Sequence, residues 1–234
     1  MNRFKEMFKP GIVVSCQALK GEPLYRPEGG IMCLMALAAE RNGAIGIRAN
    51  DVVDIPQIAQ TVDLPIISIL KRVYDDAEVY ITPTMDEVDE LMATGVVKCI
   101  AIDCTIGTRP NGENINDFIP RVKEKYPDLV IMADISTYEE AINAYKLGVD
   151  VVSTTMYGYT PWSQGERPAV ELIRRLTSEI DIPVVAEGGV RSEQNIADVF
   201  QAGAYACVIG GAITRPQEIC ERYIGFYNRE VAGK

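Results

Sequence analysis

The segment at residues 64–72 reads LPIISILKR. It opens with a run of branched apolar residues, which is typical of a strand that is covered on both faces. It then places Lys71 where such a strand should end. A lysine at that point either begins a solvated loop or presents an amine to a pocket, and the fold around the strand decides between the two.

Seven other segments share this character. Each is a short apolar run bounded by turn residues, and most are continuous rather than alternating, as expected for parallel strands with helices on the outside. The eight expected strands, in chain order, are residues 12–17, 44–49, 65–71, 98–103, 129–134, 150–155, 183–188 and 206–211.

Segments with helical periodicity lie between these strands, and several carry clear end signals. Thr84 with Glu87, and Thr137 with Glu140, fit capping boxes, in which a hydroxyl and a carboxylate three residues later satisfy free amides at a helix start. Ser192 is a further expected N-cap. Helix ends are expected at three glycines that precede strands: Gly95, Gly148 and Gly203.

The unit of strand, loop, helix and turn therefore occurs eight times. That count predicts a (β/α)8 TIM barrel, and a doubly wound open sheet is the alternative. No linker rich in Pro, Gly or Ser interrupts the chain, and 234 residues is an ordinary length for one barrel. We expect a single domain over residues 1–234.

Composition excludes several classes of function. The net charge of −10 and the lack of a basic run argue against a nucleic-acid partner. The first residues lack the apolar region of a secretory signal, and no run of 18 apolar residues occurs, so we expect a cytoplasmic protein without membrane association. In that compartment the six scattered cysteines should be free thiols rather than disulfides.

Histidine is absent from the sequence. This removes histidine bases, triads and metal ligands together, so any acid or base must be Lys, Asp, Glu, Tyr or Cys.

The barrel prediction places function at the C-terminal ends of the strands. The residues expected there are Gln17, Arg48, Lys71, Asp103, Asp134, Thr154 with Thr155, Glu187, and Gly210 with Gly211. Any one of them can be the polar residue that ordinarily ends a strand. As a set, however, Arg48, Lys71, Asp134 and Glu187 should converge on one axis, which favours a functional pocket.

Two glycine-rich loops predict a phosphate site. Gly188 and Gly189 follow the seventh expected strand, and Gly210 and Gly211 follow the eighth. In TIM barrels these loops frequently bind phosphate through backbone amides, and Arg215 could add a charged donor. The alternative is that the glycines only make tight turns. We assign phosphate binding to Gly189, Gly210, Gly211 and Arg215.

Other features allow more than one interpretation. Thr155 and Tyr157 belong to a hydroxyl-rich stretch at residues 154–160 that can bind a polyol or be an ordinary loop. The stretch from Asp103 to Arg109 is equally open. An aromatic stripe in the last helix predicts packing, either in the core or against a second subunit, and we expect a homodimer: Tyr223, Phe226 and Tyr227.

The chain resembles the N-acetylmannosamine-6-phosphate 2-epimerase family along essentially its whole length. The matching segments are VSCQAL (14–19), IGIRAN (45–50), KR (71–72), ITPT (81–84), AIDCT (101–105) with RP (109–110), MADIST (132–137), STTMYGYT (153–160), AEGGV (186–190) and GGAITRP (210–216). Cys104 and Met156 depart from the family pattern, at positions between the important residues.

The resemblance implies a (β/α)8 isomerase of sialic acid catabolism. Such an enzyme interconverts N-acetylmannosamine 6-phosphate and N-acetylglucosamine 6-phosphate without a redox cofactor or a required metal. It also implies a site lined by Gln17, Arg48, Lys71, Asp134, Glu187 and Arg215, with the lysine as the catalytic residue.

The expected roles follow from the chemistry of epimerisation at C2. Lys71 is the expected base, its pKa lowered by burial or by Arg48. Glu187 should pair with Lys71, orient it and relay protons. Arg48 and Gln17 should hold O1 or the acetamido group, and Asp134 should position a hydroxyl or share in proton transfer.

Three other functions remain open at this point. A lyase or aldolase would use Lys71 to form a Schiff base. A non-catalytic barrel would bind the phosphosugar and exchange no proton at C2. An epimerase of the ribulose-phosphate type is disfavoured, because the histidine ligands typical of that group are absent.

Overall fold

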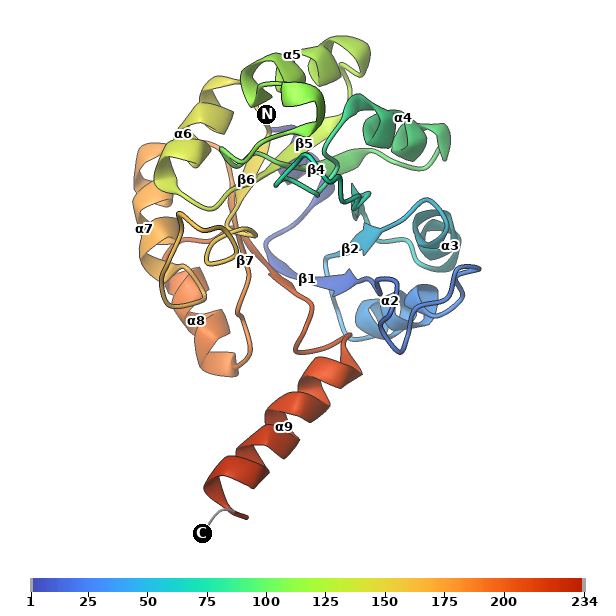
Figure 1. Cartoon of the computed structure of the whole chain (residues 1–234), viewed down its shortest axis with the longest axis vertical. Helices are drawn as coiled ribbons and strands as arrows, with labels where there is room; N and C mark the ends of the chain where they lie inside the picture. Colours follow the sequence, from blue (N-terminus) through green and yellow to red (C-terminus); the bar gives the residue numbers. More distant parts are fainter. Residues whose placement is uncertain (1, 233–234) are drawn as a thin grey trace.

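A computed structural model describes residues 2–232 of the chain. Its strands are parallel and close into one barrel in the order of the sequence (Figure 1). This confirms the predicted (β/α)8 fold over the open sheet. The strands are β1 (Gly11–Cys16), β2 (Gly46–Asn50), β3 (Ile66–Ile69), β4 (Cys99–Asp103), β5 (Val130–Asp134), β6 (Val151–Ser153), β7 (Val184–Glu187) and β8 (Ala206–Ile209).

The helices that follow the first seven strands form a ring around the barrel (Figure 1). They are α2 (Met32–Arg41), α3 (Asp54–Thr61), α4 (Met85–Ala93), α5 (Ile115–Lys125), α6 (Tyr138–Lys146), α7 (Val170–Glu179) and α8 (Glu193–Gln201), with a short 3-10 turn, η1 (Pro110–Gly112), before α5. Both capping boxes and the Ser192 N-cap are confirmed. Gly95, Gly148 and Gly203 all have positive φ, as a glycine after a helix requires.

Alternate residues of each strand pack into two separate cores. Val14 belongs to the larger core, shared with the ring of helices, whereas its neighbour Val13 belongs to the core inside the barrel. Both faces of a strand are therefore covered, which explains the continuous apolar runs in the sequence.

The N-terminal helix α1 (Arg3–Met7) has no counterpart among the predicted elements. Its Phe4 and the following Phe8 are fully buried in the inner core and stack with ring centroids 4.5 Å apart. Only five residues long, the helix offers too little periodicity to be predicted. These two rings fill the end of the barrel opposite the strand C-termini.

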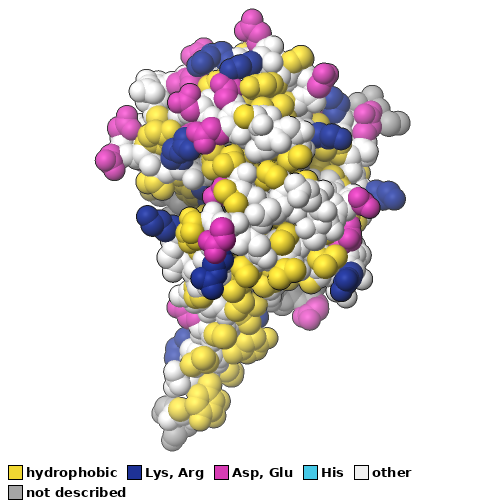
Figure 2. Space-filling view, turned by 90° about the vertical axis from the view of Figure 1, so that its right-hand side faces the viewer, with side chains coloured by type: hydrophobic (Ala, Val, Ile, Leu, Met, Phe, Trp, Pro, Cys, Tyr) yellow, Lys and Arg dark blue, Asp and Glu magenta, His cyan; other side chains and the backbone are white. Residues whose placement is uncertain are grey.

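The last helix, α9 (Pro216–Glu230), differs from the rest of the ring. It projects away from the barrel (Figure 1), and none of its residues is buried. Hydrophobic side chains lie along it (Figure 2), and its aromatic residues are more than half exposed. Tyr223, Phe226 and Tyr227 therefore do not pack in the core, which leaves the second of the two predicted interpretations.

Two smaller expectations can be compared with the structure. All six cysteines are free, although Cys220, on α9, is exposed rather than buried. Within residues 2–232, no helix has both the length and the apolar character needed to cross a membrane.

Candidate active site

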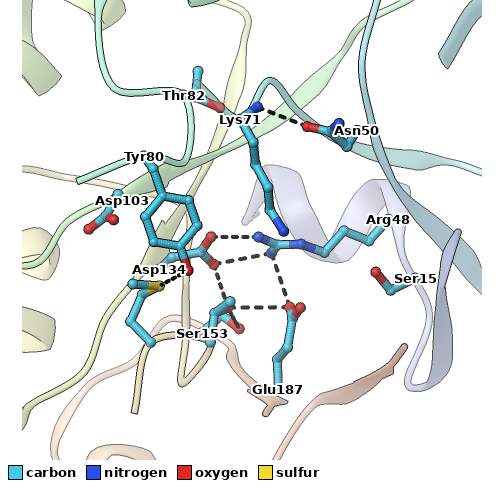
Figure 3. Close-up of polar contacts among 12 residues, drawn as sticks. Ser15, Arg48, Asn50, Lys71, Tyr80, Thr82, Asp103, Asp134, Ser153 and Glu187 are labelled. Atoms are coloured by element: carbon cyan, nitrogen blue, oxygen red, sulfur yellow. Dashed lines mark hydrogen bonds and ion pairs between the residues drawn. The ribbon is translucent and has the colours of Figure 1, made fainter. Parts of the chain in front are cut away.

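A cavity of about 200 Å³ opens at the C-terminal end of the barrel. The predicted site residues that line it come from β2, β7 and the segments that follow β1, β3, β6, β7 and β8: Gln17, Arg48, Lys71, Thr155, Glu187, Gly189, Gly210, Gly211 and Arg215. The expected convergence of strand ends is thus observed. Figure 3 shows the polar residues at its centre.

Arg48 forms the floor of the cavity and is 1% exposed. Its guanidinium donates two hydrogen bonds to Asp134, at 3.1 and 2.6 Å, and lies 3.0 Å from a Glu187 oxygen (Figure 3). Burial alone lowers the pKa of Arg48, but the charges of Asp134 and Glu187 outweigh burial and raise that pKa above its ordinary value. Three strands are thereby joined by one buried ionic cluster: β2, β5 and β7.

Lys71 reaches into the cavity from just beyond β3. Its backbone amide donates to Asn50 at 2.8 Å, and the residue forms an antiparallel bridge with Ile81. The side chain then extends towards Arg48 (Figure 3). Burial, together with the charges of Arg48 and Arg215, lowers the pKa of Lys71 to about 8. The lysine is therefore not the start of a solvated loop, and its neutral amine is far more accessible near neutral pH than that of an ordinary lysine.

Glu187 has a perturbed pKa of the opposite sense. Burial raises it to about 7, with Arg48 acting against the rise. The salt bridge of Glu187 goes to Arg48, and Lys71 forms none among the residues that the structure describes. The expected Glu187–Lys71 pair is therefore corrected: Glu187 acts on Lys71 through its charge, without a direct contact.

Asp134 is fully buried behind Arg48 and does not line the cavity. One of its oxygens accepts from both Arg48 and the Thr155 hydroxyl, the latter at 2.6 Å. The other accepts from Arg48 alone. Its expected contact with a sugar hydroxyl is thus replaced by an indirect role, in which it fixes Arg48 and Thr155.

The loop after β6 places a different tyrosine in the cavity from the one predicted. Tyr157 is outside the lining, and its hydroxyl packs so closely on Gly165 that a Cβ there would lie 1.9 Å away. Tyr159 lines the cavity instead and stacks under Arg167, whose guanidinium carbon lies 4.3 Å from the ring centroid. Both tyrosines lie in an irregular loop, where strand periodicity no longer predicts direction.

The two glycine loops also line the cavity. Gly189 has φ +75°, and a Cβ on it would lie 2.3 Å from that of Arg167, so only glycine fits there. Within residues 2–232, the backbone amides of Gly189, Gly211 and Ala212 donate to no carbonyl. Free amides beside Arg215 are the groups that an anion would accept from.

Several lining residues were not predicted: Ser15, Tyr80, Arg191 and Glu218 join Tyr159 in this group. Ser15 lies two residues before Gln17 and accepts its amide at 2.8 Å, so inward alternation along β1 could have identified it. Tyr80 lies in the segment between β3 and α4, and no sequence pattern marked it as a site residue. Burial raises the pKa of Tyr80 to about 12, so it stays protonated near neutral pH.

The predicted residues after β4 do not line the cavity and instead hold a neighbouring loop in place. Asp103 and Arg109 are buried but lie outside the cavity lining. Arg109 donates to the carbonyl oxygens of Pro83, at 2.9 Å, and of Asp103. These contacts hold the loop before α4 against the end of β4.

Comparison with known proteins gives a consistent result. A family model described as "Putative N-acetylmannosamine-6-phosphate epimerase" matches residues 32–229. Curated relatives with the corresponding 2-epimerase description include one from Caldanaerobacter subterraneus, 48% identical over 92% of this chain and 90% of its own. Another relative, from Clostridioides difficile, is 48% identical over 92% of this chain and 95% of its own length.

Among solved structures, the N-acetylmannosamine-6-phosphate 2-epimerase from Clostridium perfringens superposes with a TM-score of 0.88. It is 46% identical, over 95% of this chain and 96% of that one. Thiamine phosphate pyrophosphorylase from Pyrococcus furiosus, at 18% identity and a TM-score of 0.58, shares the fold.

Proposed function

This chain belongs to the N-acetylmannosamine-6-phosphate epimerase family, and we propose on that premise that it interconverts N-acetylmannosamine 6-phosphate and N-acetylglucosamine 6-phosphate. The reaction would be a cytoplasmic step of sialic acid catabolism. The observation that supports the proposal is one cavity lined by Lys71, whose pKa is lowered to about 8, by Glu187, whose pKa is raised to about 7, and by two glycine-rich loops.

The chemistry required is proton transfer at one carbon. The two sugars differ only in configuration at C2, which in the open-chain aldose lies next to the C1 carbonyl. Its proton can be removed if the resulting enolate is stabilised, and it must be returned to the opposite face. A pair of acid and base groups whose pKa values lie near the working pH is suited to both steps.

Lys71 and Glu187 form such a pair. In one direction a neutral Lys71 removes the proton from C2 while a protonated Glu187 supplies one to the other face. In the reverse direction an ionised Glu187 is the base and the Lys71 ammonium is the acid. Their pKa values of about 8 and 7 allow both protonation states to be populated near neutral pH.

Arg48 and Gln17 would stabilise and orient the enolate. Each has one buried polar atom without a partner in the described part of the chain, namely Arg48 Nε and Gln17 Oε1. Such atoms are rare in folded proteins and here lie beside the cavity, where a ligand would pair with them. The Arg48 N–H would donate to O1, and the Gln17 oxygen would accept from the acetamido N–H.

The phosphate of the sugar would bind at the glycine loops. The free amides of Gly189, Gly211 and Ala212, with Arg215, supply donors in a protein whose net charge of −10 otherwise repels anions. Binding energy at this remote group would hold C2 between Lys71 and Glu187.

Isotope exchange tests this function. Incubation of the protein with N-acetylmannosamine 6-phosphate in deuterated water should yield N-acetylglucosamine 6-phosphate with deuterium at C2, and prolonged incubation should label both epimers. Partial labelling of early product is compatible with a shielded proton. A borohydride-trapped adduct on Lys71 together with unlabelled sugar would indicate Schiff-base chemistry, and binding without exchange would indicate a phosphosugar-binding protein.

We also propose that the protein is a homodimer joined through α9. A helix with aromatic and aliphatic residues along it and no buried residue is rarely stable in water alone. A second copy would cover it, and two-fold symmetry would make the contact reciprocal.

Changing Phe226 to Glu should therefore shift the protein from dimer to monomer, because the charge would be desolvated in the interface. Sedimentation velocity at micromolar concentration measures the shift. Asn228→Glu is the matched control: it adds the same charge on the same helix without removing an aromatic ring. A wild-type protein that sediments as a monomer would refute the proposal.

A further inference from the structure

Arg215, the expected phosphate ligand, is already held by two carboxylates. Its guanidinium lies 2.8 Å from Glu218 and 3.3 Å from Glu22. Glu218 lines the same cavity as Arg215 and the glycine loops. A phosphate that binds Arg215 must therefore compete with negative charge that the protein itself supplies.

Glu218 also lies against the glycine loop. While one of its oxygens accepts from Arg215, the other lies 2.2 Å from the position that a Cβ on Gly211 would occupy. The carboxylate thus lies between the Arg215 guanidinium and Gly211, next to the loop in which the amides of Gly211 and Ala212 donate to no carbonyl within residues 2–232. It occupies part of the space in which a phosphate would sit.

The Glu218 side chain has a second possible hydrogen-bond partner, at the N-terminus of α9. It is the third residue of α9, whose N-cap, Arg215, has no side-chain cap. In α4 and α6 the glutamates at this same position, Glu87 and Glu140, turn back to accept from the backbone amide of the N-cap residue. The corresponding amide of Arg215 donates to no carbonyl within residues 2–232, so it is available to Glu218.

We propose that Glu218 is a displaceable internal anion that occupies the phosphate site in the free enzyme and moves to cap α9 when phosphate binds. The inference rests on the proposed function, because it requires Arg215 and the glycine loops to bind the phosphate of the substrate. Its consequence is selectivity. A monoanion that replaces Glu218 at Arg215 gains little, whereas a phosphate dianion brings more charge and more acceptor oxygens to the same donors.

The test compares Glu218→Gln with the wild type. Glutamine keeps the shape and the hydrogen bond to Arg215 but removes the competing charge. Inorganic phosphate, titrated by calorimetry at pH 7.5, should bind roughly threefold to tenfold more tightly to the variant. The KM for the phosphorylated sugar should fall by a similar factor.

Glu221→Gln is the matched control, since it removes the same charge from the next turn of α9, where the side chain is exposed and outside the site cavity. Phosphate affinity that falls in Glu218→Gln would overturn the proposal and make Glu218 a residue that orients Arg215. An equal gain in both variants would also overturn it, because general charge would then explain the effect.

Failure of the underlying function has a different signature. If inorganic phosphate bound neither the wild type nor Glu218→Gln, and Arg215→Ala left the KM for the phosphorylated sugar unchanged, the glycine loops would not be a phosphate site at all. If Arg215→Ala weakened phosphate binding while Glu218→Gln had no effect, only the role of Glu218 would be refuted.

Discussion

Replacing Lys71 with alanine should lower turnover of N-acetylmannosamine 6-phosphate by roughly 10² to 10⁴, the usual contribution of a general base or acid. The substituted amine reaches the centre of the cavity, has a pKa lowered to about 8, and lies close to the buried Arg48 cluster (Figure 3). No other lysine lines the cavity among the described residues, so no neighbour can replace it. Coupled detection of N-acetylglucosamine 6-phosphate measures the loss.

The fold and the phosphate site should survive this change, because Lys71 lies beyond the end of β3 and its bond to Asn50 uses the backbone amide. Inorganic phosphate should bind to Lys71→Ala nearly as well as to the wild type, with a small loss of affinity due to the lost positive charge. Lys98→Ala, at an exposed lysine before β4, controls for loss of a positive charge. Turnover of Lys71→Ala within threefold of the wild type would rule out the catalytic assignment.

The pH dependence gives this prediction a second readout. Activity in either direction needs Lys71 and Glu187 to carry one proton between them in the required arrangement. The active fraction therefore falls below the pKa of Glu187, near 7, and above that of Lys71, near 8. The wild-type profile of kcat/KM should be bell-shaped with its maximum between these values, and Lys71→Ala should lose the alkaline limb.

The fold was predictable because its signals are local. Each capping box at Thr84 and Thr137 depends on residues three positions apart, and each helix-ending glycine is a single backbone requirement. The parallel strands add continuous apolar runs, since both of their faces are covered. The short helix α1 lacked these signals, and α9 carried helical signals that did not reveal its separation from the barrel.

The site was predictable where strands aim the side chains. Arg48, Lys71 and Glu187 follow from counting strand ends in a barrel. The sequence did not predict that Glu187 pairs with Arg48 rather than with Lys71, because the choice of cation depends on how far each side chain reaches across the barrel. Tyr159 lies in an irregular loop, where no period relates sequence to side-chain direction. Glu218 lies in the first turn of α9, and its place in the cavity depends on the direction that this helix takes from the barrel.

Replacing Arg48 with methionine should lower the free energy of unfolding by about 3–5 kcal/mol at pH 7.5, because it leaves buried carboxylates without their cation. Arg48 bonds to Asp134 and Glu187 at distances of 2.6–3.1 Å and is 1% exposed. Methionine keeps most of the volume, so the loss reports charge rather than a cavity. Urea denaturation measures it, and catalysis should be lost as well.

Arg3→Met is the control for Arg48→Met, because Arg3 makes a similar two-point contact with a carboxylate near the surface. Arg3 forms a similar two-point contact with Asp150, at 2.9 and 3.0 Å, but the arginine is 37% exposed at the other end of the barrel. Solvent screens that pair, and its removal should cost only about 1 kcal/mol. The difference between the two variants compares a buried arginine that has two carboxylate partners with a partly exposed arginine that has one.

The deficit of Arg48→Met should also depend on pH in a defined direction. Burial already raises the pKa of Glu187 from its ordinary 4.5 to about 7, and Arg48 opposes that rise. Without the arginine the folded-state pKa must increase further, so the folded protein binds a proton that the unfolded chain has released. The stability of the variant should then fall as pH rises through the window from about 4.5 to above 7, and its deficit should shrink in acid.

Adding Glu187→Gln to Arg48→Met should recover part of the lost stability and weaken its pH dependence, because one of the two unpaired carboxylates, that of Glu187, is then gone. In the wild-type background the same Glu187→Gln change should gain much less stability, since Arg48 already offsets part of the cost of burying the Glu187 charge and would lose a partner. This difference between the two backgrounds is the sharpest test of the buried cluster. If Glu187→Gln had the same effect in both backgrounds, Arg48 and Glu187 would be energetically independent, and Glu187 could not owe its charge state to the arginine.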